Sequence, residues 1–327
     1  MLLQFFLFAL GLGVLYLGAD WLVRGASALA LDLGIRPLMV GLTVVALGTS
    51  MPELLLNVFA VVQGVDALAI GNIIGSNIAN IGLILGVTAL VLPLTVAPEA
   101  LKKEYPMMLG VTLLFWFLSW QGAGLSRIDG AILVTCLVAF MVYILKTART
   151  RPPGSVEIPV ADDFDAPEAS PLARFASTKL GRVTYVIIGM GMLALGAELM
   201  VSSAVDIGDR LGIHPGVIGL TAVAIGTSLP ELAASLVCAL RGEADMSVGN
   251  VLGSNMLNII FVVGLVAMIQ PMAVEQEALD IHFPVMVGFT LLLFPLAWTR
   301  FRINRPEGAV LLTAFLSYFA YLLYPYL

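Results

Sequence analysis

Long apolar runs alternate with short polar interruptions along this chain, a pattern typical of membrane-spanning helices. A window of 18 or more mostly apolar residues is long enough to cross a hydrocarbon core of about 30 Å. The predicted helices cover residues 3–31, 37–63, 67–93, 104–120, 127–146, 182–208, 214–240, 245–270, 280–299 and 307–326. Residues 147–181 are rich in proline and charge, and they predict a linker between two five-helix halves, 1–146 and 182–327.

One segment of 46 residues recurs without a gap 178 positions later. Residues 41–86 and 219–264 are identical at 20 of 46 positions, concentrated in GTSxPEL and GNxxGSNxxNI. The similarity continues upstream, where Asp20 corresponds to Glu198 within apolar helices. Corresponding broken or polar segments in the two halves of a membrane protein point to the substrate site of a secondary transporter.

The number of helices in each half determines their relative orientation. A unit of five helices begins and ends on opposite sides of the membrane, so the second half enters upside down relative to the first. The sequence therefore predicts an all-α polytopic membrane protein of ten transmembrane helices, built as two inverted-topology repeats. This architecture supplies alternating access to a site near the membrane midplane.

Composition supports the membrane assignment and sets the orientation. Hydrophobic residues make up 60% of the 327 positions, charged residues 12%, and the mean hydropathy is +1.00. A soluble domain carries about 25% charged residues. The chain has no basic stripe, so nucleic-acid binding is not expected. Of the 16 lysines and arginines, all but Arg24, Arg127 and Arg210 fall in loops on one side, which predicts a cytoplasmic linker and both termini outside.

The GTSxPE segment contains the first candidate site residues. Pro52 lacks an amide hydrogen, so the helix is expected to break around Ala46 to Thr49. Glu53 lies near the middle of its span, where a carboxylate costs roughly 2.5–3.5 kcal/mol and is functional by default. Freed carbonyls, the Thr49 and Ser50 hydroxyls and this carboxylate form a hard-oxygen site that suits Ca²⁺ or Na⁺. The second half repeats the spacing with Ala224, Thr227, Ser228 and Glu231.

Neither half can complete a calcium site alone. Calcium takes six to eight oxygen ligands, which two symmetric half-sites can supply. Glu53 and Glu231 together balance the charge of one Ca²⁺. Without a cation the two carboxylates repel each other, and we therefore expect protons to compete with the cation.

The GSNxxN segment on the next helix of each half supplies further oxygens. Ser76 and Asn80 are four residues apart and share a helix face, as do Ser254 and Asn258. The small residues Gly71, Gly75, Gly249 and Gly253 are expected to let this helix approach the broken one closely. Helix packing with serine and asparagine as interhelical contacts is the alternative, but pairing with GTSxPE in both copies favours a site.

The duplicated GTSxPE and GSNxxN blocks resemble the α-repeats of Na⁺/Ca²⁺ exchangers in the cation/calcium antiporter superfamily, above all the compact prokaryotic branch. The resemblance implies four cation sites, exchange of three Na⁺ for one Ca²⁺, and movement of the first and sixth helices. It implies calcium ligation by Glu53 and Glu231 with the carbonyls of Thr49 and Thr227. It implies sodium ligation by the carbonyls of Ala46 and Ala224 and the hydroxyls of Ser50, Ser228, Ser76 and Ser254, with Asn80 and Asn258 at the central position.

One residue departs from several relatives, which carry aspartate at the position of Asn258. The amide lowers the charge of the site, and by resemblance this argues against potassium dependence. The linker contains no large insert like the calcium-sensing domains of animal exchangers. No such regulation is therefore expected.

The leading hypothesis is thus a secondary antiporter exchanging Na⁺ for Ca²⁺, with a Ca²⁺ or other cation/H⁺ antiporter using the same two glutamates as the alternative. A passive channel is less consistent with single-chain inverted symmetry. An intramembrane protease is not expected, because neither His214 nor His282 lies in a motif with a serine and GxGD is absent. The sequence predicts no enzyme, no cofactor and no obligate protein partner. A prokaryotic inner membrane is the expected location, with the lipid bilayer and the two transported cations as partners.

Overall fold

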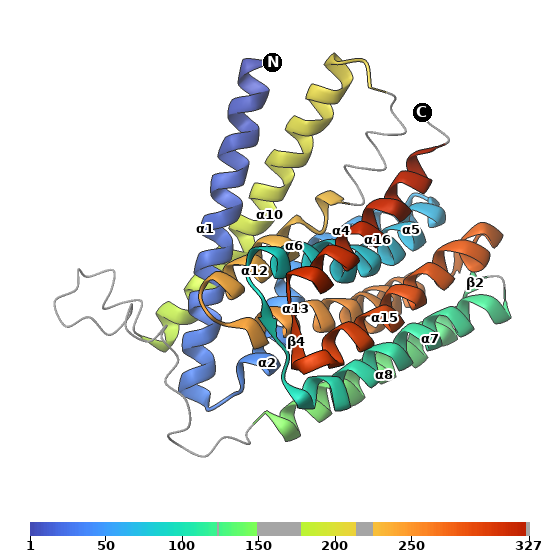
Figure 1. Cartoon of the computed structure of the whole chain (residues 1–327). Helices are drawn as coiled ribbons and strands as arrows, with labels where there is room; N and C mark the ends of the chain where they lie inside the picture. Colours follow the sequence, from blue (N-terminus) through green and yellow to red (C-terminus); the bar gives the residue numbers. More distant parts are fainter. Residues whose placement is uncertain (123, 149–177, 214–224, 325–327) are drawn as a thin grey trace.

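The computed structural model describes residues 1–122, 124–148, 178–213 and 225–324. These residues form a helix bundle with two short β-ribbons (Figure 1). The elements of the first half are α1 (Leu2–Leu33), α2 (Pro37–Val40), η1 (Gly41–Val45), α3 (Ala46–Thr49), α4 (Met51–Val62), α5 (Asp66–Ala79), η2 (Asn80–Leu85), α6 (Gly86–Val91), β1 (Leu94–Thr95), η3 (Ala100–Glu104), α7 (Tyr105–Gln121), β2 (Gly124–Leu125) and α8 (Arg127–Thr147).

Within the described residues, the second half follows the same order of elements, with one additional turn, η7. Its described elements are α10 (Lys179–Arg210), α12 (Leu229–Leu240), α13 (Ala244–Leu257), η5 (Asn258–Val263), α14 (Gly264–Ile269), β3 (Met272–Ala273), η6 (Ala278–His282), α15 (Phe283–Trp298), η7 (Thr299–Phe301), β4 (Arg302–Ile303) and α16 (Arg305–Leu323). The 178-residue offset of the sequence repeat extends through the halves: α5 and α13 begin at 66 and 244, and the π-helical turns η2 and η5 at 80 and 258.

Helical segments lie in each of the ten predicted ranges, although the seventh is described only from residue 225. Within the described residues, seven helices are long and apolar enough to cross a membrane. They cover Leu2–Leu33, Asp66–Val91, Arg127–Thr147, Lys179–Arg210, Ala244–Ile269, Ala278–Phe301 and Arg305–Leu323. The pair Pro37–Thr49 and Met51–Val62 passes the same test as one span bent by 44°.

The two halves are interlocked rather than side by side. Strand β1 pairs antiparallel with β4, and β2 pairs antiparallel with β3, so each ribbon joins one half to the other. Helices of the two halves are also in close contact with each other. A Cβ added to Gly130 of α8 would meet Gly264 of α14, and a Cβ added to Gly86 of α6 would meet Gly308 of α16. A single apolar core cluster accordingly contains residues of both halves.

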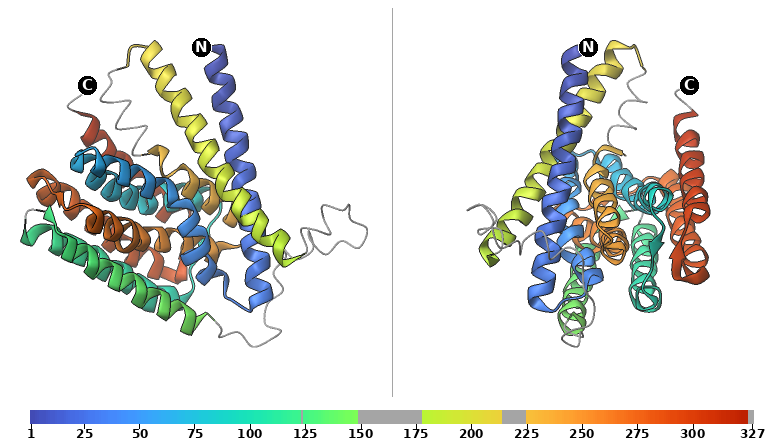
Figure 2. Two further views of the ribbon diagram at one scale, coloured as in Figure 1. Left: turned by 180° about the vertical axis from the view of Figure 1, so that it is seen from behind. Right: turned by 60° about the vertical axis from the view of Figure 1, so that its left-hand side comes forward.

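Helices α1 and α10 form an antiparallel pair that stands apart from this core. They lie side by side in all three views and are inclined to the other long helices (Figures 1 and 2). Glycines allow the close contact, since a Cβ on Gly18 would lie 2.7 Å from the backbone nitrogen of Leu193. A Cβ on Gly189 would likewise lie 2.6 Å from the backbone nitrogen of Leu22. Small residues at such an interface let two backbones approach within a membrane.

The predicted helix break is present and lies slightly later than expected. Helix α3 ends at Thr49, and α4 begins at Met51 with Pro52 in its first turn. The residue between them, Ser50, has φ −84° and ψ 5°, outside the helical region. Proline is favourable in the first turn of a helix, where its missing amide hydrogen has no partner to lose. The break therefore falls at Ser50, one residue after the predicted range Ala46 to Thr49.

Candidate functional site

The two repeated glutamates occupy equivalent positions directly after the helix breaks. Glu53 lies in the first turn of α4 and Glu231 in the first turn of α12, and neither side chain is exposed. The two carboxylates are close enough to interact electrostatically. The structure thus brings together two acidic groups that are 178 residues apart in the sequence, in a setting without solvent.

Hydroxyl groups from each half contact polar groups of the other half. The Ser50 hydroxyl donates a hydrogen bond of 3.3 Å to Oε1 of Glu231. The Thr49 hydroxyl donates to the side-chain oxygen of Asn250 at 3.4 Å. In the equivalent contact, Thr227 donates to the side-chain oxygen of Asn72 at 3.2 Å.

The predicted residue Ser76 joins the same network, because its hydroxyl lies 3.5 Å from the hydroxyl of Thr227. Ser228 and Ser254 are also buried. Among the hydroxyls of the two motifs, those of Thr49, Ser50, Ser76 and Thr227 therefore make contacts that cross between the halves.

Two asparagine pairs join the halves. The Asn80 amide donates to the side-chain oxygen of Asn255 at 3.0 Å, and the Asn258 amide donates to that of Asn77 at 3.3 Å. These two bonds are equivalent under the 178-residue offset. Each bond orients one predicted site residue, Asn80 or Asn258, through its amide nitrogen. The side-chain oxygen of that residue is then available to bind a cation.

Sequence reasoning missed four residues of this network: Asn72, Asn77, Asn250 and Asn255. Each is buried and hydrogen-bonded to a residue of the opposite half. All four belong to the GNxxGSN blocks and are identical in the two copies. This identity between the repeats is the observation from which they could have been predicted.

Several buried oxygens at the site have no hydrogen-bond partner among the described residues. An unpaired buried polar atom costs about 1–3 kcal/mol, and more when it is charged. A cation satisfies such oxygens, because it needs acceptors and no donors. The oxygens are Oε1 and Oε2 of Glu53, Oε2 of Glu231, the hydroxyls of Ser228 and Ser254, and the side-chain oxygens of Asn80 and Asn258.

The predicted backbone ligand Ala46, unlike these side-chain oxygens, already has hydrogen-bond partners. The Ala46 carbonyl accepts a hydrogen bond of 3.0 Å from the Ser50 amide, and it lies 3.3 Å from the Thr49 hydroxyl, whose single hydrogen it shares with Asn250. A cation at this carbonyl would therefore share it with two donors. The equivalent residue, Ala224, lies outside the described residues, as does most of the linker.

The glycines of the second GSN helix bring it against the broken helix of the opposite half. A Cβ on Gly253 of α13 would meet the Leu42 backbone of η1, with its carbonyl oxygen 2.6 Å away. A Cβ on Gly249 would likewise meet the backbone of Leu38 and, less closely, that of Leu42. The expected close approach is therefore a contact between halves. Gly71 and Gly75 are the equivalent glycines of the first half. Their expected contacts, residues 216 and 220, lie outside the described residues.

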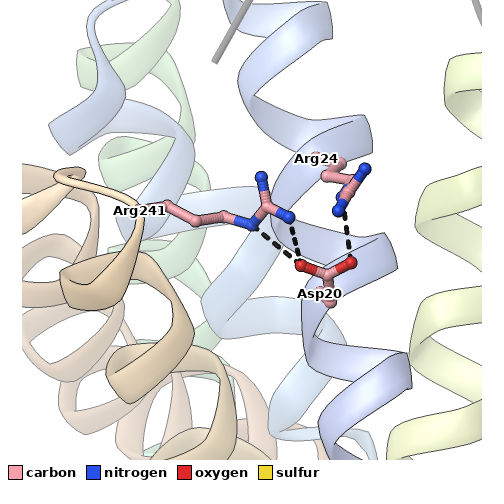
Figure 3. A network of polar contacts seen from close by, with 3 residues as sticks. All are labelled: Asp20, Arg24 and Arg241. Carbon is pink, nitrogen blue, oxygen red and sulfur yellow. Dashed lines mark hydrogen bonds and ion pairs between the residues drawn. The ribbon is translucent and has the colours of Figure 1, made fainter. Parts of the chain in front are cut away.

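Asp20, the other repeated acidic position, does not line the site. It forms ion pairs with Arg24 at 2.9 Å and with Arg241, whose Nε lies 2.8 Å from the carboxylate (Figure 3). Arg241 follows the last residue of α12, so this contact joins α1 to the helix that carries Glu231. The equivalent residue Glu198 is exposed on α10. The sequence alone did not indicate that Arg241 and Asp20 would meet.

Comparison with known proteins agrees with this geometry. The family model described as sodium/calcium exchanger protein matches residues 3–146 and 182–324. The sodium/calcium exchanger MaX1 of Methanosarcina acetivorans is 30% identical over 348 residues, covering 98% of this chain and 99% of that protein. The inner membrane protein YrbG of Escherichia coli is 35% identical over 325 residues, covering 98% and 97% respectively.

A solved structure points the same way. The sodium-calcium exchanger NCX_Mj, soaked with Na⁺ and Ca²⁺, superimposes with a TM-score of 0.81 at 31% identity, covering 98% of both chains. These matches span both halves, and the site described above lies within them. These relatives define the class as a membrane transporter of cations. The chain belongs to the sodium/calcium exchanger family, in its compact prokaryotic form.

Proposed function

We propose that this protein is a secondary antiporter that exchanges Na⁺ for Ca²⁺ across the membrane. The observation that carries the proposal is the pair of fully buried glutamates, three of whose four carboxylate oxygens lack hydrogen-bond partners among the described residues. Two buried carboxylates without a counter-charge are costly, by several kcal/mol for each ion. A divalent cation between them removes this cost and supplies the partner that the oxygens lack.

The chemistry of the donor set favours Ca²⁺ and Na⁺ over other cations. Carboxylate, hydroxyl and amide oxygens are the ligands of hard cations, whereas zinc and copper favour nitrogen and sulfur. Glu53 and Glu231, with the carbonyls of Thr49 and Thr227, are the proposed calcium ligands. The proposed sodium ligands are neutral: the carbonyls of Ala46 and Ala224, the hydroxyls of Ser50, Ser228, Ser76 and Ser254, and Asn80 and Asn258.

Alternating access follows from the proposed inverted topology of ten helices. The repeated elements and the ribbons that join the halves support a two-fold relation in the plane of the membrane. Because α1 and α10 pack mainly on each other, they can move together relative to the bundle that holds the glutamates. We place the protein in a prokaryotic inner membrane, with its termini outside and its linker in the cytoplasm.

A cation/H⁺ antiporter is the second candidate, and the same buried carboxylates favour it, since they can also carry protons. The neutral hydroxyl and amide oxygens proposed beside them are ligands that suit Na⁺, whereas proton transport needs only the carboxylates. For this reason we propose sodium rather than the proton as the driving ion.

The test is ⁴⁵Ca²⁺ uptake into proteoliposomes that contain the purified chain. Vesicles loaded with Na⁺ are diluted into Na⁺-free buffer, and a parallel set carries a pH gradient without sodium. Uptake that requires the outward sodium gradient supports the proposal. Uptake that follows the pH gradient and ignores sodium would establish the proton antiporter instead. Calcium flux that runs down its own gradient without counter-transport of Na⁺ or H⁺ would indicate a channel.

A further inference from the structure

A groove unrelated to the glutamate site runs between α7 and α8, which lie along one edge of the bundle (Figure 1). The cavity measures about 330 Å³. Met107, Gly110, Val111 and Leu114 form one wall, and Cys136, Ala139, Phe140 and Tyr143 form the other. Met256 and Ile260 of the second half lie at its floor. Gly110 and Ala139 are exposed, so the groove opens on the outer surface of the bundle.

The lining is apolar almost throughout, and its outer surface is the one that the proposed topology exposes to lipid. Gly110 and Ala139 are the smallest wall residues. They leave open the space between the walls that larger side chains would fill. From Met107 to Leu114 the wall extends for about 10 Å along the helix axis. A groove of this width and length fits a segment of an acyl chain.

One end of the groove carries exposed lysines. Lys146 follows Tyr143 by three residues in α8, and Lys103 lies in the π-helical turn η3 that directly precedes α7. The buried carboxylate of Glu104, in the same turn, accepts a hydrogen bond of 2.6 Å from the Tyr143 hydroxyl. Both lysines are exposed, and Lys102 lies beside them. In the proposed topology this end lies at the cytoplasmic surface, where anionic lipids attract lysine and arginine at about 1 kcal/mol for each residue.

The equivalent region of the second half lacks both features. Phe289 stands 178 residues after Val111, and its ring lies 2.7 Å from a Cβ added to Gly82, so it fills the space above the floor. The Tyr318 hydroxyl and the His282 ring, 2.9 Å apart, join the two walls there, as the Tyr143 hydroxyl and the Glu104 carboxylate do in the first half. Phe289, and not this contact, therefore distinguishes the two regions. Asp280 and Ile281 replace Lys102 and Lys103. The groove and the lysines at its end therefore occur together in the first half, whereas the equivalent region of the second half has neither.

We propose that the α7–α8 groove binds an anionic phospholipid, with an acyl chain between the helices and the headgroup phosphate at Lys103 and Lys146. The site belongs to the cytoplasmic leaflet and is separate from the cation path. It rests on the proposed membrane orientation but not on the identity of the transported ions.

The test uses the purified full chain in a neutral detergent and native mass spectrometry with two lipids of identical acyl chains, phosphatidylglycerol and phosphatidylcholine. The wild type is expected to retain phosphatidylglycerol at least several-fold better than phosphatidylcholine. Val111→Phe copies the second half and is expected to abolish this retention. Leu113→Phe, on an exposed face of the same helix, is the matched control and is expected to retain the lipid like the wild type.

The double variant Lys103→Gln and Lys146→Gln tests the headgroup. It is expected to weaken phosphatidylglycerol binding by about fivefold for each lysine, while phosphatidylcholine binding stays unchanged. Equal retention of both lipids by the wild type, or full retention by Val111→Phe, would overturn the proposal. Sodium-driven calcium uptake is measured on the same preparations, so that loss of the lipid site and loss of transport are distinguished.

Discussion

Asp20 and Arg241 form an ion pair between α1 and the end of α12, and this contact joins the α1–α10 pair to the bundle that holds the site. Arg24 binds the other oxygen of the same carboxylate. Asp20 is only 8% exposed, so solvent screens the pair less than it screens a surface ion pair. Arg241 also lies at a helix C-terminus, where a cation is favourable.

The 178-residue offset shows that this contact has no ionic equivalent. Asp20 corresponds to Glu198, but Arg241 corresponds to Gln63, which carries no charge. In an inverted-repeat transporter the two access states exchange the roles of the halves. The ion pair therefore stabilises the state described here, and the opposite state has only an amide in its place.

Neutralising the ion pair is expected to loosen α1 from the bundle. Asp20→Asn or Arg241→Gln should change the equilibrium constant between the two access states by about tenfold, which corresponds to roughly 1.4 kcal/mol. Spin labels on the exposed residues Tyr16 and Leu240 report the distance between α1 and α12 by pulsed electron resonance. Glu198→Gln is the control. A distance distribution in Asp20→Asn identical to that of the wild type would exclude this role for the contact.

The contact between α1 and α10 is expected to tolerate no side chain at Gly18. Gly18→Leu should separate the helices or prevent folding, because an added Cβ lies within 3 Å of the Leu193 nitrogen and the Gly189 oxygen. Both are backbone atoms and cannot move aside cheaply. Gly13→Leu on the same helix has open space among the described residues and should behave like the wild type. Thermal unfolding of the purified variants compares them, and equal stability would contradict the packing described.

The asparagine pairs are expected to hold the halves in register. Asn255→Ala removes the acceptor of the Asn80 amide and leaves that buried donor unpaired, so the free energy of unfolding should fall by about 1–3 kcal/mol. Sodium affinity should fall as well, because Asn80, a proposed sodium ligand, loses its fixed orientation. Ser317→Ala, which removes an exposed hydroxyl, is the control. Unchanged stability and sodium affinity in Asn255→Ala would show that the pair has no such role.

Calcium binding is expected to weaken as the pH falls. A proton on Glu53 or Glu231 removes charge that the cation requires, so protons and Ca²⁺ compete for the same oxygens. The apparent KM for calcium uptake should rise as the pH falls, whereas the maximal rate changes less. Uptake kinetics over a range of pH, with the sodium gradient held constant, provide the measurement. A KM that is independent of pH would argue against direct competition at the carboxylates.

Much of the fold was accessible from the sequence, because hydrophobic length and an internal repeat are both local patterns. Helical segments occur in the predicted ranges, and Pro52 indicated a break that falls one residue late. The π-helical turns and the two-residue strands were not predicted. Strands of that length have no periodicity, and β1 pairs with a strand more than 200 residues away.

The missing parts of the site have a similar cause. The sequence placed Thr49 and Glu53 together by spacing, but it could not show that Thr49 bonds to Asn250, because that contact depends on how the halves interlock. Arg241 was interpreted as an ordinary cytoplasmic loop residue for the same reason. Contacts between the halves are set by tertiary packing, and the repeat alone indicates which residues correspond but not which residues meet.

The most direct test of the account is sodium-driven ⁴⁵Ca²⁺ uptake by proteoliposomes that carry Glu53→Gln or Glu231→Gln. Both substitutions preserve size and remove one of the two charges between which calcium is proposed to lie, so each alone should abolish uptake. Glu275→Gln, at an exposed residue, should leave uptake unchanged. Substantial sodium-driven uptake in either single variant would contradict a site that is shared between the halves.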